Sequence, residues 1–574
     1  MTDRLTEQVL KLFDLNNEQR EAATEPAKDV VVTAGAGSGK TSTLVARYAC
    51  LLAYGTKPRR IAAVTFTIKA AQEMRSRVRK NLAELQGKAE TPDERQFWAD
   101  LSAQIDSARI GTVHSLCAEI LRNHPAEAGV DPRFDLIEDG LAVALKAQVV
   151  EEEMARLVEN NRFLPLLYNL PVSDLSKLLR QMLQKRLETL ETFAIAVDNQ
   201  TRLIRELKDR MGSPVFSDLI AGLRGMSPQQ LKADAGEKLA DVALELLGLW
   251  SLAERALEED DPVNCALNLY QIRRNCLMTR AGIQDSITKQ IFVEFKKSYD
   301  AILNPMTYGA ESKDELPSAD SEARFEQLLP LLREAFDRVH QAYLSQLERR
   351  QALDFDDLEF HAQRLLSIPE IRQRWQQELQ AIMVDEYQDT NPRQRDIVNA
   401  LAGDRGCLFL VGDMRQSIYR FRRADVTVFR EEQKRINRQN GRLINLNLTY
   451  RAHEVLLNAT GDLLSDVIGT EEQPTRKYYV PYTPLVAHKK APEHPVRPPH
   501  VEFIIGAGED AATAKPRAGQ ALAARLLELK EEGQIQKWSD VAMLFRATNW
   551  LPLLRGSTRR RRHPFRLGGW ERLL

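Results

Sequence analysis

The sequence has few cysteines and lacks any long hydrophobic run. Its five cysteines lie scattered among 574 residues and form no C-x-x-C pair. This argues against structural zinc, an iron–sulfur cluster or a disulfide framework, and it fits a reducing compartment. No uninterrupted apolar stretch is long enough to span a membrane, and no signal peptide is visible. We therefore expect a cytoplasmic protein that does not act on a membrane.

An excess of charge of one sign is also lacking. The chain has 80 Lys and Arg residues against 81 Asp and Glu residues, which gives a net charge of −1. Any contact with nucleic acid must therefore come from local basic patches and not from a global field. At 574 residues the chain is too long for one hydrophobic core, so we expect roughly two to four domains.

The most informative stretch runs from Val30 to Thr43, with the sequence VVVTAGAGSGKTST. Its first four residues are β-branched and predict a short, buried parallel strand. The chain then turns and enters a helix at Lys40 and Thr41. This fits the phosphate-binding pattern G-x-x-x-x-G-K-[ST], with Ala34 in place of the first glycine. The loop residues are Ala34, Gly35, Ala36, Gly37, Ser38 and Gly39.

The composition of this loop has a direct chemical reason. Glycines let backbone N–H groups surround an anion, and the helix N-terminus adds its partial positive charge. Lys40 neutralises the β- and γ-phosphates, and the Thr41 hydroxyl is a ligand for Mg²⁺. The alternative is a glycine-rich turn that binds nothing. The β-branched strand before the loop and the GKT sequence after it favour a nucleoside triphosphate site that uses ATP and Mg²⁺.

Strands and helices alternate around this loop. Buried strands are expected at Ile61–Thr67, Ile110–Ser115, Ala381–Val384 and Gly406–Val411, and helices follow the first two. This alternation predicts a parallel α/β sheet whose ligand lies at the carboxyl ends of the strands. Residues from about 141 to 351 are instead rich in Leu, Glu, Arg and Gln with helical periodicity, which predicts a mainly helical insertion.

Beyond residue 442 we expect a second, partial α/β domain. The run Leu443–Leu446 begins this further unit, and Val501–Ile505 and Asp540–Phe545 have the apolar pattern of strands in a second sheet. The segment from 473 to 499 between them is rich in Pro, Lys and His and predicts a linker or excursion.

The strand Ala381–Val384 ends on Asp385 and Glu386. A buried strand that ends in two carboxylates is the natural partner of a phosphate loop. Asp385 would hold Mg²⁺ directly or through water, and Glu386 would polarise the water that attacks the γ-phosphate. An ordinary acidic loop is the alternative, but the run VDEYQDTN is far too specific for it.

Four motifs together resemble superfamily 1 DNA helicases of the UvrD/RecB type. They are VDEYQDTN, VGDMRQSIYRFR, TAGAGSGKT and AVTFTIKAAQEMRSRV, and they occur in the order of that family. The stretches IGTVHSLCAEILR, DPRF and LDFDDL, with the long helical insertion, favour the RecB/AddA branch over the compact UvrD/Rep branch.

The resemblance implies roles for further residues. Gln19 would contact adenine, and Gln416 would lie between the γ-phosphate and the DNA. Tyr450 would place its ring against the adenine, and Arg451 would act on the γ-phosphate as an arginine finger in cis. With Lys40 and Glu386, Gln416 and Arg451 complete the expected catalytic set.

The resemblance also implies a track for single-stranded DNA. Its candidate residues are Phe66, His114, Tyr419, Phe421 and Arg422. Aromatic faces stack on any base and so bind single strands with little regard to sequence. For each aromatic residue alone, packing in the core is the alternative, and the motif context of Phe66 and Tyr419 argues against it.

The implied architecture has two RecA-like motor domains of the P-loop NTPase class. The first comprises residues 1–125 and 351–442 and is interrupted by a helical insertion at 126–350, and residues 443–574 form part of the second. The implied activity is ATP-dependent 3′-to-5′ translocation on DNA in repair or recombination. The RecB/AddA branch works in helicase–nuclease complexes, so a partner protein within such a complex is a further implication.

The chain departs from the family pattern at several positions. Ile68, Thr449 and Arg423 stand where the family usually has Asn, Asn and Gly. The last two motifs of the family, which include a second arginine finger, are not found, and an arginine-rich run follows at Arg555–Arg562. We therefore expect a chain that stops before the last helicase motifs, with slow hydrolysis and poor unwinding.

Two further function classes compete with a helicase. The first is a non-motor module that binds DNA or a partner in a nucleotide-dependent way. Glu386 argues against it, because a module that does not hydrolyse ATP has no need for a water-polarising carboxylate. The second is a small-molecule phosphotransferase, which gives no account of the VGDMRQSIYRF segment.

Overall fold

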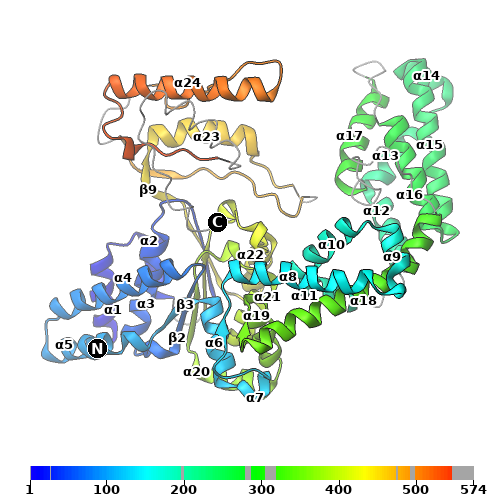
Figure 1. Cartoon of the computed structure of the whole chain (residues 1–574). Helices are drawn as coiled ribbons and strands as arrows, with labels where there is room; N and C mark the ends of the chain where they lie inside the picture. Colours follow the sequence, from blue (N-terminus) through cyan, green and yellow to red (C-terminus); the bar gives the residue numbers. More distant parts are fainter. Residues whose placement is uncertain are drawn as a thin grey trace. The chain divides into compact units, whose positions relative to one another are not determined.

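The computed structural model describes residues 2–25, 28–194, 199–277, 286–303, 319–473, 476–491 and 498–545. The chain divides into two compact units (Figure 1). The first unit comprises residues 1–129, 359–472 and 480–574, and the second comprises 130–358 and 473–479.

A six-stranded parallel sheet forms the centre of the first unit. Its strands have the spatial order β3-β2-β6-β7-β1-β8, and every neighbouring pair is parallel. The strands are β1 (Val30–Ala34), β2 (Ile61–Thr65), β3 (Arg109–Thr112), β6 (Ala381–Val384), β7 (Leu408–Gly412) and β8 (Arg442–Leu446). The predicted parallel α/β fold is confirmed.

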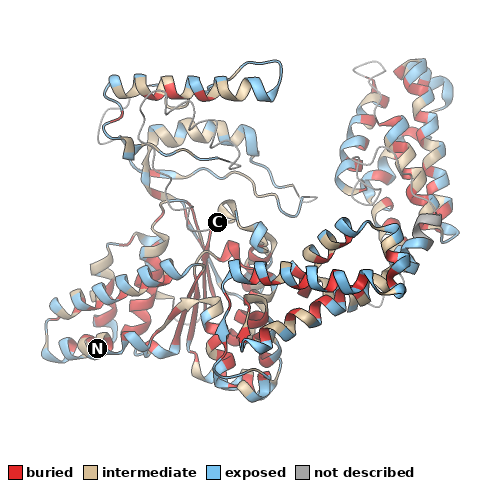
Figure 2. Ribbon diagram, in the orientation of Figure 1, coloured by how far each residue is buried: buried red, intermediate tan, exposed pale blue. Residues whose placement is uncertain are grey.

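Helices cover both faces of this sheet, which is why its central strands β1, β2, β6 and β7 are mostly apolar. The side chains of Val30, Val32, Phe409 and Val411 pack with α1, α3, α4 and α5 into one core, and Figure 2 shows the central strands buried. The helices of this unit that precede and follow the insertion are α1 (Thr2–Phe13), α2 (Asn17–Thr24), α3 (Lys40–Ala53), α4 (Ile68–Gly87), α5 (Pro92–Gln104), α6 (Val113–Asn123), α7 (Pro125–Ala128), α19 (Phe355–Leu366), α20 (Pro369–Glu378), α21 (Pro392–Ala402) and α22 (Val426–Arg438).

The first sheet extends further along the chain than the sequence analysis expects. Strand β8 pairs in parallel with β1, with Val32 opposite Ile444 and Ala34 opposite Leu446. The run Leu443–Leu446 is therefore the last strand of the first sheet and not the start of a second domain. As an edge strand, β8 buries only Ile444 and Leu446, so its weaker apolar pattern did not mark it as part of a core sheet.

The part of the first unit that follows β8 contains two strands and two long helices among its described residues. Strands β9 (Leu448–His453) and β10 (Val486–Lys489) pair in parallel, and the helices are α23 (Glu454–Ile468) and α24 (Ala511–Glu531). The strands predicted at Val501–Ile505 and Asp540–Phe545 are wrong, since neither stretch is a strand. A strand is defined by pairing with a neighbour, and an apolar pattern alone does not supply one.

Among its described residues, the second unit is helical apart from a short parallel pair formed by β4 (Asp135–Leu136) and β5 (Ala352–Leu353). Its described apolar residues include one cluster around Phe216, Trp250 and Phe295 and one around Phe163 and Phe336. Its helices are α8 (Asp139–Val158), α9 (Leu164–Asn169), α10 (Val172–Gln184), α11 (Arg186–Ala194), α12 (Asn199–Met211), α13 (Pro214–Arg224), α14 (Pro228–Ala235), α15 (Glu237–Glu258), α16 (Pro262–Gln271), α17 (Ile287–Ile302) and α18 (Ala319–Arg349).

Shorter helical segments complete the described structure. Single turns of 3₁₀ helix lie at Pro58–Arg60, Ile105–Ser107, Asn161–Phe163, Tyr387–Asp389, Met414–Gln416, Arg420–Arg422 and Trp538–Asp540, and a π-helical turn lies at Ile272–Cys276. Among the described residues, none of the helices is long and apolar enough to cross a membrane.

A buried ion network explains two of the aspartates in the LDFDDL stretch. Arg186 is fully buried and donates to Asp354 Oδ1 at 2.7 Å and to Asp357 Oδ1 at 2.6 Å. Tyr343 donates its hydroxyl to Asp354 at 2.9 Å, and Lys146 lies 3.3 Å from the same carboxylate. Burial opposes ionisation of Asp354, but Arg186 and Lys146 hold its pKa below the usual range.

Replacing Arg186 by Ala should destabilise the helices that meet at this network. The change leaves two buried carboxylates without their shared cation, which costs about 3–5 kcal/mol. Hydrogen–deuterium exchange should show the loss of stability as faster exchange of the backbone amides of α11 and α18. The matched control is Arg255→Ala, which removes an exposed ion pair with Glu259 and should cost at most about 1 kcal/mol. Equal protection in both variants would contradict the assigned role of Arg186.

Candidate nucleotide and DNA site

The predicted phosphate loop joins the end of β1 to the start of α3. Gly37 and Gly39 have positive φ angles of 76° and 84°, and α3 begins at Lys40 directly after Gly39. A Cβ atom on Gly37 would lie 2.5 Å from the Cβ of Arg451, and one on Gly39 would lie 2.5 Å from Nε2 of Gln19. Only glycine satisfies both the left-handed backbone and the close approach at these positions.

Three neighbouring groups fix the loop by binding its carbonyl oxygens. Thr449 Oγ1 donates to Ala36 O at 2.8 Å, and the Tyr450 backbone N–H donates to Gly37 O at 2.9 Å. Gln19 Nε2 donates to Ser38 O at 2.9 Å. In a trans peptide the N–H points away from the preceding carbonyl, so the N–H groups of Gly37 and Gly39 are turned away from these donors. The Ser38 N–H instead donates to Gly35 O at 3.2 Å. This geometry suits an anion at the helix N-terminus.

Lys40 and Glu386 meet at the carboxyl edge of the sheet. Lys40 Nζ lies 3.0 Å from Glu386 Oε2, which brings the phosphate loop and the VDEYQDTN motif together as predicted. Glu386 adopts a left-handed backbone with φ of 51°, a conformation that costs a non-glycine residue energy and tends to occur at functional sites. Its side chain is 38% exposed, so it is accessible to water.

Asp385 lies at the end of β6, beside Glu386. Its Oδ1 accepts a hydrogen bond from the Glu386 backbone N–H at 3.0 Å. Burial and, next, the negative charge of Glu386 raise the pKa of Asp385 to about 6. A buried carboxylate whose pKa is raised binds a cation favourably, because the cation compensates the cost of burying the negative charge.

A Mg²⁺ ion fits the residues present. Mg²⁺ is usually bound by one or two carboxylates or hydroxyls together with water and substrate phosphates, and it needs no cage of protein ligands. Thr41 and Asp385 are the candidate protein ligands, on α3 and at the end of β6. The Ser38 hydroxyl is fully buried, has no hydrogen-bond partner among the described residues and can donate to a phosphate oxygen.

The structure gives Gln19 a supporting position. Gln19 is 3% exposed, and its Oε1 accepts from the Asn16 backbone N–H at 3.0 Å in the capping box of α2. Its Nε2 donates to Ser38 O of the phosphate loop. The side chain is therefore engaged within the protein at both ends, and its contact with adenine stays a prediction.

Tyr450 and Arg451 lie on β9, directly beside the loop. The Tyr450 ring is 4.8 Å from the ring of His488, and its hydroxyl accepts from Asn16 Nδ2 at 3.5 Å. The Arg451 side chain is exposed, while its backbone N–H donates to Thr449 Oγ1 at 3.3 Å. The two residues lie beside the loop, and their roles toward adenine and the γ-phosphate stay predictions.

Thr449 is a supporting residue that sequence reasoning missed. The sequence marks it only as a departure from the Asn of the family, yet it is 1% exposed and binds both the loop and Arg451. Its position directly before Tyr450 was the available signal. Arg423 has φ of 70°, which accounts for the glycine that the family usually has at this position, but nothing in the structure explains the arginine. Ile68 is 70% exposed at the start of α4.

Gln416 lies just beyond the carboxyl end of β7, which separates β6 from β1 in the sheet. Its Nε2 donates to Asp413 Oδ2 at 2.9 Å. The same aspartate caps the turn that contains Gln416, by accepting from the Arg415 backbone N–H at 3.1 Å. Asp413 therefore holds the Gln416 side chain near the carboxyl edge of the sheet. The contact of Gln416 with a γ-phosphate stays a prediction.

Four of the five candidate DNA residues form one aromatic cluster, composed of Phe66, Tyr419, Phe421 and Arg422. The rings of Phe66 and Tyr419 lie 4.8 Å apart, and those of Tyr419 and Phe421 lie 5.8 Å apart. The guanidinium of Arg422 lies 5.8 Å from the Tyr419 ring centre. Phe421 is 74% exposed, which argues against core packing for this residue.

His114 follows β3 and is held by a different partner. Its Nε2 lies 3.1 Å from Oε1 of Glu359, a buried carboxylate that also accepts from Asn391 Nδ2 at 3.1 Å and Gln394 Nε2 at 2.6 Å. Burial would raise the pKa of Glu359, but the hydrogen bonds and charge of these partners, His114 first, lower it. Sequence reasoning missed Glu359, which directly follows LDFDDL.

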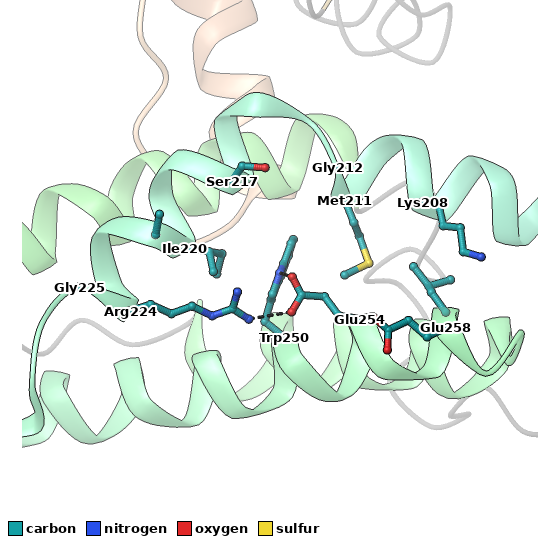
Figure 3. Close-up of a pocket in the computed structure, with 12 residues that line it drawn as sticks. Lys208, Met211, Gly212, Ser217, Ile220, Arg224, Gly225, Trp250, Glu254 and Glu258 are labelled. Carbon is teal, nitrogen blue, oxygen red and sulfur yellow. Dashed lines mark hydrogen bonds and ion pairs between the residues drawn. The ribbon is translucent and has the colours of Figure 1, made fainter.

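A separate hollow lies in the helical unit (Figure 3). It is lined by residues of α12, α13 and α15, including Lys208, Trp250 and Glu258. The Glu254 carboxylate accepts from Arg224 at 2.7 Å and from Trp250 Nε1 at 3.0 Å. Because these polar groups satisfy one another and none belongs to a nucleotide motif, we assign no role to this hollow. The arginine-rich run Arg555–Arg562 lies outside the described residues.

Comparisons with known proteins agree with this geometry. The family model of the UvrD/REP helicase N-terminal domain matches residues 15–437. The chain is 28% identical over 554 residues to an ATP-dependent helicase/nuclease subunit of Streptococcus sanguinis (strain SK36), covering 88% of this chain and 44% of that protein. The protein of the same name from Pediococcus pentosaceus is 28% identical over 490 residues, 79% of this chain and 39% of that protein.

The chain thus spans less than half the length of these two curated relatives. The family match extends from before the phosphate loop to the end of α22, and it includes the segments that carry Lys40, Glu386 and Gln416. The chain belongs to the family of the UvrD/REP helicase N-terminal domain.

Proposed function

We propose that this polypeptide is an ATP-dependent DNA helicase or translocase that moves 3′ to 5′ on single-stranded DNA in repair or recombination. The observation that carries the proposal is the contact between Lys40 of the phosphate loop and Glu386 of the VDEYQDTN motif. A lysine that binds phosphate and a water-accessible carboxylate, 3.0 Å apart, are two of the groups that hydrolysis of a γ-phosphate uses.

The chain's own residues divide the work of hydrolysis. The loop N–H groups and Lys40 bind the β- and γ-phosphates, while Thr41 and Asp385 hold Mg²⁺, which neutralises charge on the phosphate oxygens. Glu386 orients the attacking water and accepts its proton, and Arg451 and Gln416 act on the γ-phosphate. Gln19 and Tyr450 hold the adenine. The pairing of Lys40 with Glu386 favours hydrolysis over a module that only binds.

The aromatic cluster is the proposed platform for single-stranded DNA. Phe421 presents an exposed ring, and Arg422 adds a positive charge beside the rings. Stacking on such rings is tolerant of base sequence, as a translocase requires. His114 is the fifth proposed contact, and its imidazole is oriented by Glu359. The polarity of movement and the pathway rest on the resemblance to the UvrD/RecB type alone.

We further propose that the protein works in the cytoplasm with a partner protein of a helicase–nuclease complex. The support is that the relatives from Streptococcus sanguinis and Pediococcus pentosaceus are each named as one subunit of an ATP-dependent helicase/nuclease. The scattered cysteines fit a reducing compartment.

Replacing Glu386 by Gln should slow hydrolysis strongly and preserve nucleotide binding. Loss of a general base costs about 10²–10⁴ in rate, whereas the phosphate loop is unchanged. Steady-state ATP hydrolysis, with and without single-stranded DNA, measures the first effect, and titration with a fluorescent nucleotide measures the second. Lys40→Ala is the companion variant and should lose binding as well. Full hydrolysis by Glu386→Gln would refute the proposed mechanism.

Replacing Phe421 by Ala should weaken binding of single-stranded DNA. Base stacking on one aromatic side chain is worth about 1–3 kcal/mol, so the dissociation constant should rise by about 5- to 150-fold. Fluorescence anisotropy of a labelled oligonucleotide measures it. Phe503→Ala is a matched control, since Phe503 is 75% exposed and lies outside the aromatic cluster. Equal effects of the two changes would show that the aromatic cluster is not the DNA platform.

A further inference from the structure

Gln388 occupies the centre of a hydrogen-bond network that the roles assigned above do not use. It follows Glu386 by two residues, is 2% exposed and lies in the 3₁₀ turn after β6. Its Nε2 donates to Glu386 Oε2 at 2.9 Å and lies 3.5 Å from Asp389 Oδ2. Its Oε1 accepts from the Asp413 backbone N–H at 2.9 Å. The side chain therefore joins the ends of β6 and β7.

The orientation of this amide is determined by its partners. A carboxylate offers only acceptors and a backbone N–H offers only a donor, so Nε2 must face Glu386 and Oε1 must face Asp413. The neighbouring strand is also adapted to Gln388. A Cβ on Gly412 would lie 2.6 Å from Gln388 Oε1 and 3.2 Å from the Gln388 backbone nitrogen, so a glycine permits the close approach.

A second contact joins Gln388 to the segment that carries the aromatic cluster. Ser417 donates its hydroxyl to the Gln388 carbonyl at 3.1 Å. Asp413 and Ser417 enclose the turn Met414–Gln416, and Tyr419 follows two residues later. The main chain and the side chain of Gln388 are thus both attached to the segment that leads from β7 to Tyr419 and Phe421.

Lys40 and Gln388 share one oxygen of the catalytic carboxylate. Lys40 Nζ lies 3.0 Å and Gln388 Nε2 lies 2.9 Å from Glu386 Oε2. In the proposed function Lys40 serves the phosphates, so Gln388 is the donor that remains with Glu386 during hydrolysis. A hydrogen bond to a charged acceptor is among the stronger ones in proteins and has a defined direction.

We propose that Gln388 is a positioning residue that holds Glu386 in its reactive orientation and transmits the state of the aromatic cluster to it. DNA bound to Tyr419 and Phe421 changes the conformation of the segment from Asp413 to Ser417. Gln388, which is hydrogen-bonded to that segment and to Glu386, passes the change to the Glu386 carboxylate. This inference rests on the proposed function and adds to it the residue by which DNA stimulates hydrolysis.

The test compares the full wild-type chain with Gln388→Met and Gln388→Glu. Methionine keeps the size and removes both hydrogen bonds, whereas glutamate keeps the acceptor for Asp413 and replaces the donor by a second negative charge. We expect kcat for ATP with saturating single-stranded DNA to fall about 10- to 100-fold in both variants, the fold-change that corresponds to one hydrogen bond to a charged group. KM for ATP should change by less than about threefold, because the phosphate loop is untouched.

A purely structural role would not produce this division between kcat and KM, nor coupling to Glu386. In the Glu386→Gln background, single-turnover hydrolysis should fall by less than about threefold on adding Gln388→Met, because both changes remove the same function. Gln376→Met is the matched control. Gln376 is partly buried and donates to Ala400 O at 2.8 Å on the sheet's helical cover, and this variant should keep wild-type rates.

The outcomes separate this inference from the proposed function. Wild-type protein that fails to hydrolyse ATP would refute the proposed function and this inference with it. Wild-type hydrolysis without stimulation by DNA would overturn the proposed transmission from DNA, and basal kcat of the variants would then decide the orienting role. Wild-type kcat in Gln388→Glu, or additive effects of Glu386→Gln and Gln388→Met, would overturn the inference alone.

Discussion

Parallel pairing of the central strands is the constraint on which the site depends. Because all six strands run in the same direction, their carboxyl ends meet at one edge of the sheet. Residues far apart in the sequence are thereby brought together. Lys40 after β1 meets Glu386 after β6 at 3.0 Å, and Phe66 after β2 meets Tyr419 after β7 with rings 4.8 Å apart. Lys40, Glu386, Phe66 and Tyr419 therefore lie along one edge of the sheet.

The phosphate loop at this edge is held by hydrogen bonds to its carbonyl oxygens. The phosphate loop is fixed from behind by Thr449, Tyr450 and Gln19, each bound to a different loop carbonyl. Such support keeps the anion-binding N–H groups preorganised, which lowers the cost of binding. In the helical unit, Arg186 plays a comparable part by neutralising two buried aspartates. In both places a buried polar contact fixes the register of segments that apolar packing alone would leave less defined.

The sequence was sufficient for the main features because they depend on local chemistry. Apolar runs predicted the strands β1, β2 and β6, and the glycines of the loop predicted a turn that can surround an anion. Gly37 and Gly39 have positive φ angles in the structure. The same reasoning failed for Val501–Ile505 and Asp540–Phe545, which have a strand pattern and are not strands. It also assigned the edge strand β8 to the following domain. β8 buries only two of its five residues, so its apolar pattern did not show that it belongs to the first sheet.

The sequence by itself determined which chemical groups are available: a glycine-rich loop, a lysine, two carboxylates after a buried strand and a set of aromatic side chains. Tertiary structure alone decided which of them touch. Gln19 donates to the carbonyl oxygen of Ser38 in the phosphate loop, and His114 contacts Glu359. Gln388 lies between Glu386 and Asp413 and is hydrogen-bonded to both. The physical reason is that propensities act over a few residues, whereas a hydrogen bond between distant segments depends on the strand order and register that the whole sheet sets.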